Sequence, residues 1–390
     1  MRAGEFQNHL ENNLIPFWSK LRDEEYGGFY GYVDGAGVVQ AESNKGVILN
    51  SRILWFYSQA YLLLGKPELL ELADHAYRFL VNHCIDSQYG GVYWSLEYDG
   101  KVCDDTKHTY NQSFAIYALS VYYQAGKRKD ALNLAYELYR VIEEKCRDEQ
   151  GYLEAFHRDF TPASNEKLSE NGVLAERTMN TLLHVLEAYT ELYRADAFYA
   201  VGDSIRWILR AFRDKIYNPE KQICEVFFDR AYHTLLDLES YGHDIEASWL
   251  IERGCNVLND VAYKKEMEPV IAGLAQAAYR NAFDKSQHAL NNEREGEKTD
   301  RQKIWWVQAE SVVGFYNGYQ MEPQKKEYLQ AAGEIWEFIL QHMIDADSGE
   351  WIETIGADNT AAPGQALVHP WKCPYHNGRM CMEMMQRLAS

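Results

Sequence analysis

The stretch Asp23-Glu-Glu-Tyr-Gly27-Gly28-Phe29-Tyr30 recurs along the chain, most clearly as Asp86-Ser-Gln-Tyr-Gly90-Gly91-Val92-Tyr93-Trp94. Both copies combine a polar, acidic turn, two glycines and a short aromatic or β-branched run. Glycine supplies the positive φ angles that tight turns of this kind need. Weaker copies follow at 147–152, 218–224, 284–290 and 347–351. Successive copies lie roughly 60 to 70 residues apart, which divides the chain into six similar units.

The sequence between these turns has the apolar spacing of three and four residues that is typical of helices. This spacing is found in 47–64, 113–123, 178–193, 245–258 and 305–319. Each unit is therefore predicted to contain two helices and a hairpin-like turn. Six such units predict an all-α fold, a closed (α/α)6 barrel of twelve helices with short β-hairpin-like loops at one mouth. An α/β arrangement is the competing interpretation, but the apolar runs are too long and too helical for it.

The length of the chain, 390 residues, would allow two domains, but closed helical barrels of this size also occur as one. We expect residues 1–390 to form a single barrel domain. The pocket of such a barrel lies on its axis. Polar residues on the apolar faces of the inner helices are therefore the candidates for a functional site.

The composition excludes several classes of partner. The chain carries 58 acidic and 39 basic residues, and its formal net charge is -19. A surface that follows a phosphate backbone needs a basic patch, and no segment is rich in Lys or Arg, so we expect no nucleic-acid partner. The acidity also favours a neutral substrate over a strongly anionic one.

Signals for secretion, membranes and cofactors are missing from the sequence. Residues 1–17 carry Glu5 and Glu11 among their apolar residues, unlike a signal peptide, and no apolar stretch of about 18 residues could span a membrane. Seven scattered cysteines with no Cys-x-x-Cys pair indicate free thiols in a reducing cytoplasm and argue against structural zinc. No phosphate-binding glycine loop, Gly-x-Ser-x-Gly elbow, dinucleotide fingerprint or His-Glu-x-x-His motif is present. We therefore expect a cytoplasmic protein without a membrane partner, a metal or another cofactor.

Aromatic residues make up 14% of the chain, with ten Trp and 28 Tyr. This is more than a helical core requires. The C–H faces of sugars stack on aromatic rings while their hydroxyl groups find polar edges, so the composition is suited to a carbohydrate pocket.

The first candidate site is Ser240-Tyr-Gly-His243-Asp-Ile-Glu246-Ala-Ser-Trp249. If a helix begins at about Asp244, His243 and Glu246 lie three residues apart on one face. A carboxylate beside an imidazole orients its tautomer and raises its basicity, so the pair could act as an acid and base. An ordinary capped helix start and half of a metal site are the alternatives for the same residues.

A second candidate is His376, which follows Trp371 and two prolines and precedes a predicted final helix over 380–388. The positive end of a helix dipole favours the neutral form of an imidazole, which is the form that can act as a base. The alternative is a terminal segment whose Trp371 and Tyr375 only close the barrel.

Two further helices carry polar residues on apolar faces. In 178–193, Asn180, His184 and Glu187 fall on one stripe, which is either a solvated face or a pocket wall. In 305–319, Trp306 and Glu310 lie four residues apart, and tandem tryptophans on an apolar helix are more often core residues than sugar platforms.

Arg52 is a charge inside an apolar helix. A buried arginine is rare without a carboxylate or an anionic ligand, so Arg52 is a candidate for holding an oxyanion. Tyr110, in His108-Thr-Tyr110-Asn-Gln112, is a weaker candidate for the same role.

At these residues the chain resembles the N-acylglucosamine 2-epimerase family, and within it the bacterial branch that acts on disaccharides. The resemblance runs from about Phe17 to the C-terminus. The matching stretches are Lys45-Gly-Val-Ile-Leu-Asn50-Ser-Arg52-Ile-Leu-Trp-Phe56, 169–172, 178–180, 240–249, 305–310, 313–315 and 371–382.

The resemblance implies an (α/α)6 barrel and epimerisation, without metal or nucleotide, at C2 of the reducing-end glucose of β-1,4-linked disaccharides. It implies that His243 and His376 are the acid and base, that Arg52 contacts sugar oxygens and that His184 assists ring opening. The residues that it places in the sugar subsites are Tyr110, Asn180, Glu246, Trp306, Glu310 and Trp371. The expected partner is a small disaccharide, and the expected state is a monomer or a weak homodimer.

The residue types suit this chemistry. A proton beside an aldehyde is weakly acidic, and imidazole is a base matched to neutral pH. Inversion at one carbon needs proton delivery on the face opposite to removal, hence two bases, and the cis-enediolate between the steps needs a cation or donors at its oxygens.

The sequence leaves three alternative functions open. The nearest is an aldose–ketose isomerase, or an epimerase of monosaccharides such as N-acetylglucosamine or mannose. An inverting glycoside hydrolase would need two carboxyl groups about 6.5–9.5 Å apart, for which Glu246 and Glu310 could be offered. A carbohydrate- or protein-binding module without turnover is the non-enzymatic alternative.

Overall fold

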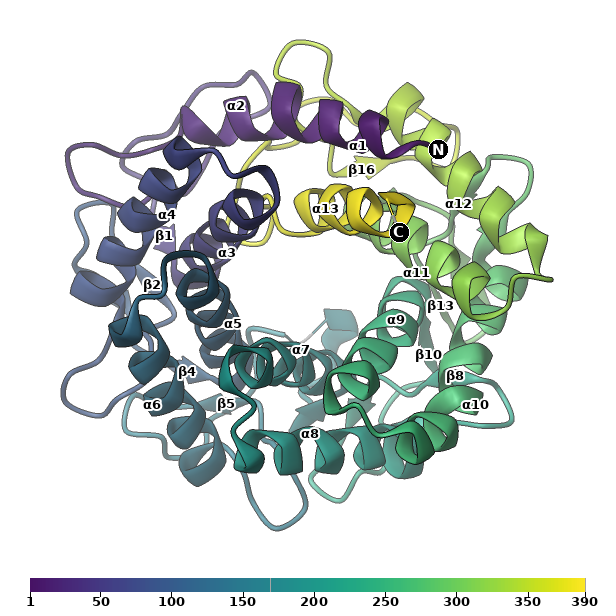
Figure 1. The fold of residues 1–390 in the computed structure, drawn as a ribbon, viewed down its shortest axis with the longest axis horizontal. Coiled ribbons are helices and arrows are strands. Elements are labelled where there is room, and N and C mark those ends of the chain that lie inside the picture. Colours follow the sequence, from purple (N-terminus) through teal and green to yellow (C-terminus); the bar gives the residue numbers. More distant parts are fainter. Residues whose placement is uncertain (169, 390) are drawn as a thin grey trace.

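The computed structural model describes residues 1–168 and 170–389. Ser169, which belongs to one of the stretches that carry the family resemblance, lies outside the described residues. The helices form a ring of two layers around a central axis (Figure 1). The inner layer consists of α3 (Val47–Leu64), α5 (Thr109–Gly126), α7 (Met179–Asp196), α9 (Tyr241–Leu258), α11 (Trp305–Met321) and α13 (His376–Ala389).

The outer layer surrounds these six helices. It consists of α1 (Ala3–His9) with α2 (Ile15–Ser19), α4 (Pro67–Phe79), α6 (Lys129–Lys145), α8 (Tyr199–Ala211), α10 (Val261–Ala277) and α12 (Lys326–Phe338). A π turn over Leu10–Leu14 joins α1 to α2, so the two are one continuous helix. Within the described residues the fold is thus an (α/α)6 barrel of twelve helices, as the repeats predict.

The two layers differ in the way their residues are buried. Every residue from Val47 to Ser58 of α3 is buried, as expected for a helix that has protein on all sides. Outer helix α4 instead buries one stripe, which includes Leu69, Ala73 and Ala76, and exposes the opposite face. The amphipathic outer helices therefore shield the inner ring from solvent.

The ends of the chain close the ring. Helix α1, at the N-terminus, packs against α13, at the C-terminus, so the sixth helical pair combines the two ends of the sequence (Figure 1). The chain begins with an outer helix and ends with an inner one. Each of the six turn repeats consequently connects an outer helix to the next inner helix, and all six lie at the same mouth.

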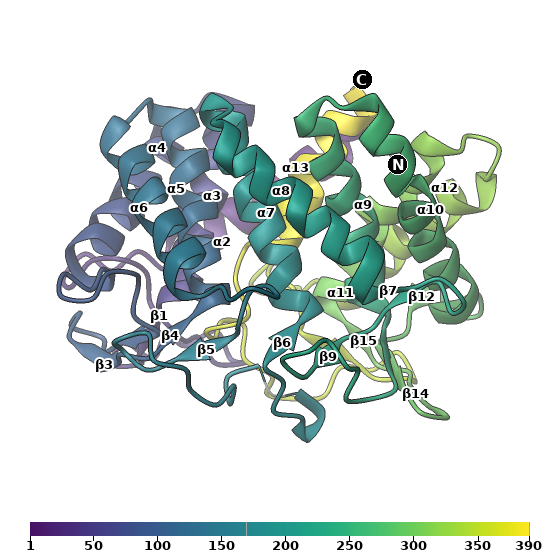
Figure 2. The same cartoon turned by 90° about the horizontal axis from the view of Figure 1, so that it is seen from below.

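Short antiparallel strands line this mouth, at the lower end of the barrel in Figure 2. The strands are β1 (Lys45–Gly46), β2 (Ser95–Leu96), β3 (Val102–Asp104), β4 (Lys107–His108), β5 (Ala155–Phe156), β6 (Arg177–Thr178), β7 (Tyr217–Asn218), β8 (Ile223–Cys224), β9 (Phe227–Phe228), β10 (Leu238–Ser240), β11 (Phe283–Asp284), β12 (Ala289–Leu290), β13 (Glu293–Glu295), β14 (Lys298–Asp300), β15 (Lys303–Ile304) and β16 (Thr354–Ile355). Most inner helices begin directly after one of these strands.

A repeated hydrogen bond ties the turns to the inner helices. The fourth residue of α3, Asn50, accepts the backbone N–H of Phe29 in the first turn, over 2.9 Å. The side chains at the same place in three other inner helices accept turn N–H groups in the same way. These bonds are Val92 N–H to Gln112, Cys224 N–H to Asp244 and Leu290 N–H to Gln308. In four of the six units the repeat is therefore also a repeat of buried polar contacts, which fixes those turns over the mouth.

Three inner helices begin earlier than the sequence predicts. Helix α5 begins at Thr109 rather than at Ser113, α9 begins at Tyr241 rather than near Asp244, and α13 begins at His376 rather than at Met380. Glycine lowers helix propensity, which argues against a helix through Gly378. The barrel nevertheless needs this glycine, because a Cβ there would lie 2.6 Å from the ring of Phe56. Across the described residues, no helix is both long and apolar enough to cross a membrane.

Candidate active site

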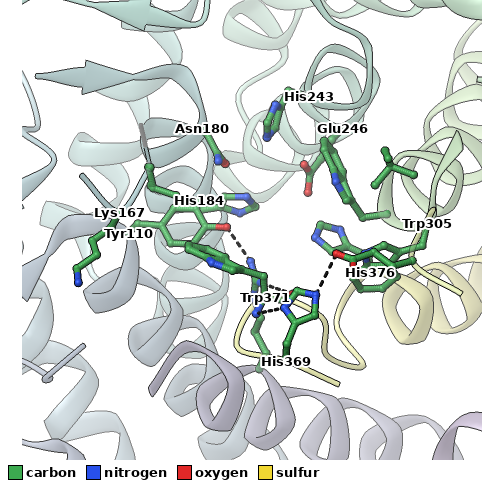
Figure 3. Close-up of a pocket in the computed structure, with 15 residues that line it drawn as sticks. Tyr110, Lys167, Asn180, His184, His243, Glu246, Trp305, His369, Trp371 and His376 are labelled. Atoms are coloured by element: carbon green, nitrogen blue, oxygen red, sulfur yellow. Dashed lines mark hydrogen bonds and ion pairs between the residues drawn. The ribbon is translucent and has the colours of Figure 1, made fainter. Parts of the chain in front are cut away.

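A cavity of about 400 Å³ opens at the strand-bearing mouth, above the N-terminal ends of the inner helices (Figure 3). Nine of the ten predicted site residues line it; Glu310 does not. The full lining is Arg52, Tyr110, Lys167, Leu168, Asn180, His184, His243, Glu246, Ile304, Trp305, Trp306, Glu353, His369, Trp371 and His376. Residues from all six inner helices therefore meet in one pocket, although they are spread over more than 300 positions of the sequence.

His376, the first residue of α13, is held by a carboxylate. Its Nδ1 atom lies 2.7 Å from Oε1 of Glu310, which is buried beneath the pocket floor. An ionised carboxylate only accepts hydrogen bonds, so it fixes the proton of the neutral ring on Nδ1. This leaves Nε2 as the ring nitrogen that can take a proton from a substrate.

His243 is held by a hydroxyl group instead. Its Nδ1 lies 2.7 Å from Oγ of Ser240, and its ring packs on Trp306 with 4.8 Å between centroids. The close approach depends on Gly242, because a Cβ there would lie 2.6 Å from the Trp306 ring. Trp306 also contacts the ring of His376, at 5.6 Å. Both imidazoles thus contact the same indole, and Nε2 of neither ring has a hydrogen-bond partner among the described residues.

The surroundings of both imidazoles favour the neutral form of the ring. Burial lowers the pKa of His243 to about 3, and the nearby His184 adds to this effect. Burial also holds the pKa of His376 well below its usual range, and the positive charges of Arg379 and Arg52 act in the same direction. Neutral rings are the forms that can act as bases.

His184, on α7, has a third arrangement. Its Nδ1 lies 2.9 Å from Oε2 of Glu187, one turn further along the helix, and its ring contacts Tyr110 at 5.1 Å between centroids. Arg379 and His184 lower the pKa of Glu187 to about 2, against the effect of burial. The predicted stripe of α7 is therefore a pocket wall, with Glu187 behind His184 rather than in the cavity.

Arg52 is buried in α3 without any carboxylate ion pair among the described residues. Its Nη2 donates to the hydroxyl of Tyr110 over 2.7 Å. Its guanidinium also lies over the rings of Phe114 and Tyr375, at 4.1 and 4.7 Å from their centroids. The positive charge is thus positioned by aromatic rings and left available to a ligand in the pocket.

Three polar atoms of lining residues lack partners among the described residues, namely Nε of Arg52 and two side-chain oxygens. Oδ1 of Asn180 and Oε2 of Glu246 are buried and make no hydrogen bond to any described residue. Burial, followed by the charge of Glu310, raises the pKa of Glu246 to about 7. Buried polar atoms are normally satisfied, so these two indicate a polar ligand rich in hydroxyl groups.

Arg379 lies beneath the pocket, one turn after His376. Its Nη2 atom lies 2.7 Å from Oε1 of Glu310 and also contacts Oε1 of Glu246. Donor atoms of Glu246, Glu310 and His376 all lie within 4.8 Å of one another, as metal ligands would. The guanidinium already supplies the cation between the two carboxylates, so these residues do not fit a metal site.

The outer part of the pocket is aromatic and polar. Trp371 packs against Trp94 at 5.8 Å between centroids and against Tyr110 at 5.9 Å. His369 lies 3.0 Å from a carboxylate oxygen of Glu353. Trp371, His369 and Glu353 line the same cavity as the two imidazoles.

Sequence reasoning missed several residues of this site. Ser240 adjoins the predicted helix start, but nothing in the sequence distinguishes its hydroxyl from a helix cap. Arg379 could have been found by the criterion that identified Arg52, a charge inside a helix with many apolar residues. From the sequence, however, this helix is predicted to begin at 380, one residue after Arg379. Lys167, Glu353 and His369 come from loops, where no periodicity indicates which side chains turn inward.

Comparison with known proteins places the chain in a family. A sequence model of the family N-acylglucosamine 2-epimerase (GlcNAc 2-epimerase) matches residues 27–377. A cellobiose 2-epimerase of Ruminococcus albus is 49% identical over 388 residues, which cover 99% of both chains. The solved structure of cellobiose 2-epimerase from Bacillus thermoamylovorans superposes with a TM-score of 0.94 at 41% identity, over 99% of both chains. A sugar epimerase from a ruminal bacterium superposes with a TM-score of 0.97 at 48% identity, again over 99% of both chains. The chain belongs to the N-acylglucosamine 2-epimerase family.

Proposed function

We propose that this protein is a carbohydrate epimerase that inverts C2 of the reducing-end glucose of β-1,4-linked disaccharides, converting cellobiose to glucosyl-mannose and lactose to epilactose. One observation carries the proposal. His243 and His376, from different helices, line one cavity and both contact Trp306, and the Nδ1 atom of each has a hydrogen-bond partner. The relatives at 49% and 41% identity, which are cellobiose 2-epimerases, support the choice of substrate.

The reaction is a proton transfer in two steps. One imidazole removes the C2 proton of the open-chain aldose, which gives a cis-enediolate. The other imidazole, which takes up a proton from solvent before this step, then delivers that proton to the opposite face of C2. Each positioned acid or base contributes about 10²–10⁴-fold to the rate.

The enediolate carries negative charge on its oxygens, and Arg52 is the proposed partner for that charge. Its guanidinium has no competing carboxylate among the described residues and is held by Tyr110 and two rings. Stabilisation of this kind acts where charge develops in the transition state.

The remaining residues bind and open the sugar ring. His184 is the proposed group for ring opening, because the Glu187 carboxylate leaves its Nε2 free for the ring oxygen or the anomeric hydroxyl. Asn180 and Glu246 offer unpartnered oxygens to sugar hydroxyl groups. Trp306 and Trp371 offer rings for the C–H faces of the two sugars.

Solvent exchange tests the reaction. Incubation with lactose or cellobiose in D2O, followed by NMR, should show deuterium at C2 of both the substrate and the epimeric product. A ketose product would favour the isomerase, and conversion of N-acetylglucosamine or mannose alone would favour a monosaccharide epimerase. Binding of cellobiose by calorimetry without turnover would contradict an enzymatic role.

Variants assign the two bases. His243→Ala and His376→Ala should each lose most of the activity and still fold, whereas His233→Ala, at an exposed histidine, should retain it. Full turnover in either pocket variant would remove that histidine from the mechanism.

The inverting glycoside hydrolase is disfavoured by geometry. One carboxylate oxygen of Glu246 lies within 4.8 Å of one of Glu310, and both carboxylates pair with Arg379. An inverting pair needs a separation of about 6.5–9.5 Å to admit water. Absence of glucose release from cellobiose would agree with this interpretation.

We also propose that residues 1–390 act as one catalytic domain in the cytoplasm, without a cofactor, as a monomer or weak homodimer. All seven cysteines are unpaired, which suits a reducing compartment. Light scattering of the purified protein tests the oligomeric state.

A further inference from the structure

Four charged side chains form a buried cluster beneath the pocket. Arg379 is 2% exposed and contacts three carboxylates, those of Glu187, Glu246 and Glu310, on three different inner helices. Its guanidinium also lies over the rings of Trp249 and Tyr375, at 4.8 and 4.3 Å from their centroids. One side chain of α13 thus connects α7, α9 and α11.

Two of the three carboxylates also hold histidines. Oε1 of Glu310 is 2.7 Å from both Nη2 of Arg379 and Nδ1 of His376. Glu187 contacts Arg379 through Oε1 and lies 2.9 Å from Nδ1 of His184 through Oε2. The position of each ring therefore depends on a carboxylate that also contacts the same guanidinium.

The charges of the cluster make this cation necessary. A single Arg379 faces three carboxylates in a space without water contact, and an unpaired buried carboxylate is costly. Without the guanidinium, the carboxylates would take up protons or turn away. A protonated Glu310 could no longer serve only as an acceptor for Nδ1 of His376.

We propose that Arg379 is a positioning residue that fixes the tautomer and orientation of His376 and His184 through Glu310 and Glu187. The inference rests on the proposed function, because it assigns Arg379 to the same proton-transfer site. Arg379 does not line the cavity and touches no substrate. Its effect reaches the reacting carbon only through the two imidazoles.

The chain offers a matched control one helical turn further along the inner helices. Arg253 on α9 pairs with Glu191 of α7 and Glu383 of α13. These residues follow Glu187 and Arg379 by four positions on the same two helices. Arg253 thus joins the same inner helices through two carboxylates, but it contacts no histidine among the described residues.

Kinetics separate positioning from stability. Arg379→Gln should lower kcat by about 10²-fold, the size of a small misplacement of a reacting group, with little change in KM. The acidic limb of its pH–kcat profile should move to higher pH, because carboxylates without their counter-ion keep protons to higher pH. Arg253→Gln should lower the melting temperature and leave kcat and the limb unchanged. The proposal would be overturned if Arg379→Gln kept the wild-type kcat and the wild-type acidic limb of the pH–kcat profile. It would also be overturned if Arg253→Gln shifted that limb as much as Arg379→Gln does.

NMR of the ligand-free protein gives a second, independent measurement. With 15N-labelled histidine, His376 and His184 should show protons on Nδ1 in the wild type and mixed tautomers in Arg379→Gln. If Arg379→Gln does not fold, Arg379→Lys tests the proposal in its place. Lysine keeps the positive charge but lacks the planar guanidinium whose several N–H groups bridge the carboxylates. Unchanged tautomers and kcat in Arg379→Lys would then contradict the inference. A wild type without C2 exchange would refute the proposed function, while the tautomers would still test Arg379.

Discussion

Nδ1 of His376 lies 2.7 Å from Oε1 of Glu310, a buried carboxylate that also pairs with Arg379. The corresponding nitrogen of His243 instead faces the hydroxyl of Ser240. A carboxylate stabilises a protonated imidazole, whereas a hydroxyl group can donate to or accept from a neutral one. The two proposed bases are thus chemically distinct, and each can be tested through its own partner.

Glu310→Gln should keep the fold, because the amide oxygen can still accept from Nδ1, but it removes the negative charge that supports a protonated His376. We expect kcat to fall about 10²-fold, within the range of one acid or base, while the affinity for the disaccharide changes little. The rate of C2 deuterium exchange and calorimetric binding check this. Glu383→Gln, at a carboxylate that pairs with Arg253 and Arg387 one turn after Arg379 on α13, is the control and should retain kcat. Full activity in Glu310→Gln would show that His376 needs no anionic partner.

Ser240→Ala should have a smaller effect than the change at Glu310. It removes one neutral hydrogen bond, worth about 1 kcal/mol, so we expect a loss of roughly tenfold or less in kcat. Single-turnover conversion of lactose is the measurement. Ser248→Ala, which removes a hydroxyl bonded only within α9, should have wild-type kcat. A loss as large as that of His243→Ala would mean that the hydroxyl itself takes part in proton transfer.

Arg52→Lys should abolish most of the turnover while the substrate still binds. Lysine is a flexible point charge and cannot keep the stacked geometry over Phe114 and Tyr375 together with the bond to Tyr110. Because enediolate charge develops only during the reaction, we expect the loss in kcat, by about 10²-fold or more, with a smaller change in KM. Arg177→Lys, at another buried arginine, should alter thermal stability and leave kcat intact. An unchanged kcat in Arg52→Lys would remove Arg52 from the stabilisation of the enediolate.

The helices of the barrel can be predicted from the sequence, because apolar spacing marks the helices and glycines mark the turns that end them. Helix α3 matches its predicted bounds, Val47 to Leu64, since Gly65 ends it with a positive φ angle of 68°. The early starts of α9 and α13 could not be predicted, because they depend on glycines that face aromatic rings from other helices. Distant packing had overridden local propensity at both positions.

The sequence predicts which residue types form the site, but not which of them line the cavity and which lie behind a cavity residue. His243, His376 and Arg52 are identified by chemistry in unusual places, and the cavity brings them together. Glu310 was expected to line the sugar subsites, whereas it lies behind His376. A sequence shows that a carboxylate lies on a helix face, but not whether a substrate or a histidine meets it.

Asp244 gives a prediction on the pH dependence of stability. It occupies the fourth position of α9, where α3, α5 and α11 carry Asn50, Gln112 and Gln308. Its Oδ1 accepts the N–H of Cys224 over 2.8 Å, but its buried Oδ2 has no partner among the described residues. Burial raises the pKa of Asp244 well above its usual range.

Because this pKa is higher in the folded than in the unfolded protein, the contribution of Asp244 to stability is complete below about pH 4 and is lost as the pH rises. Asp244→Asn removes this dependence, and its amide could donate to the carbonyl four residues earlier, as Asn50 does to Gly46. We therefore expect the melting temperature to fall less between pH 5 and pH 8 in Asp244→Asn than in the wild type. Calorimetry at both pH values measures this, with Asp203→Asn, at an exposed aspartate, as the control. Equal falls in Asp244→Asn and the wild type would mean that Asp244 is ionised in the folded protein.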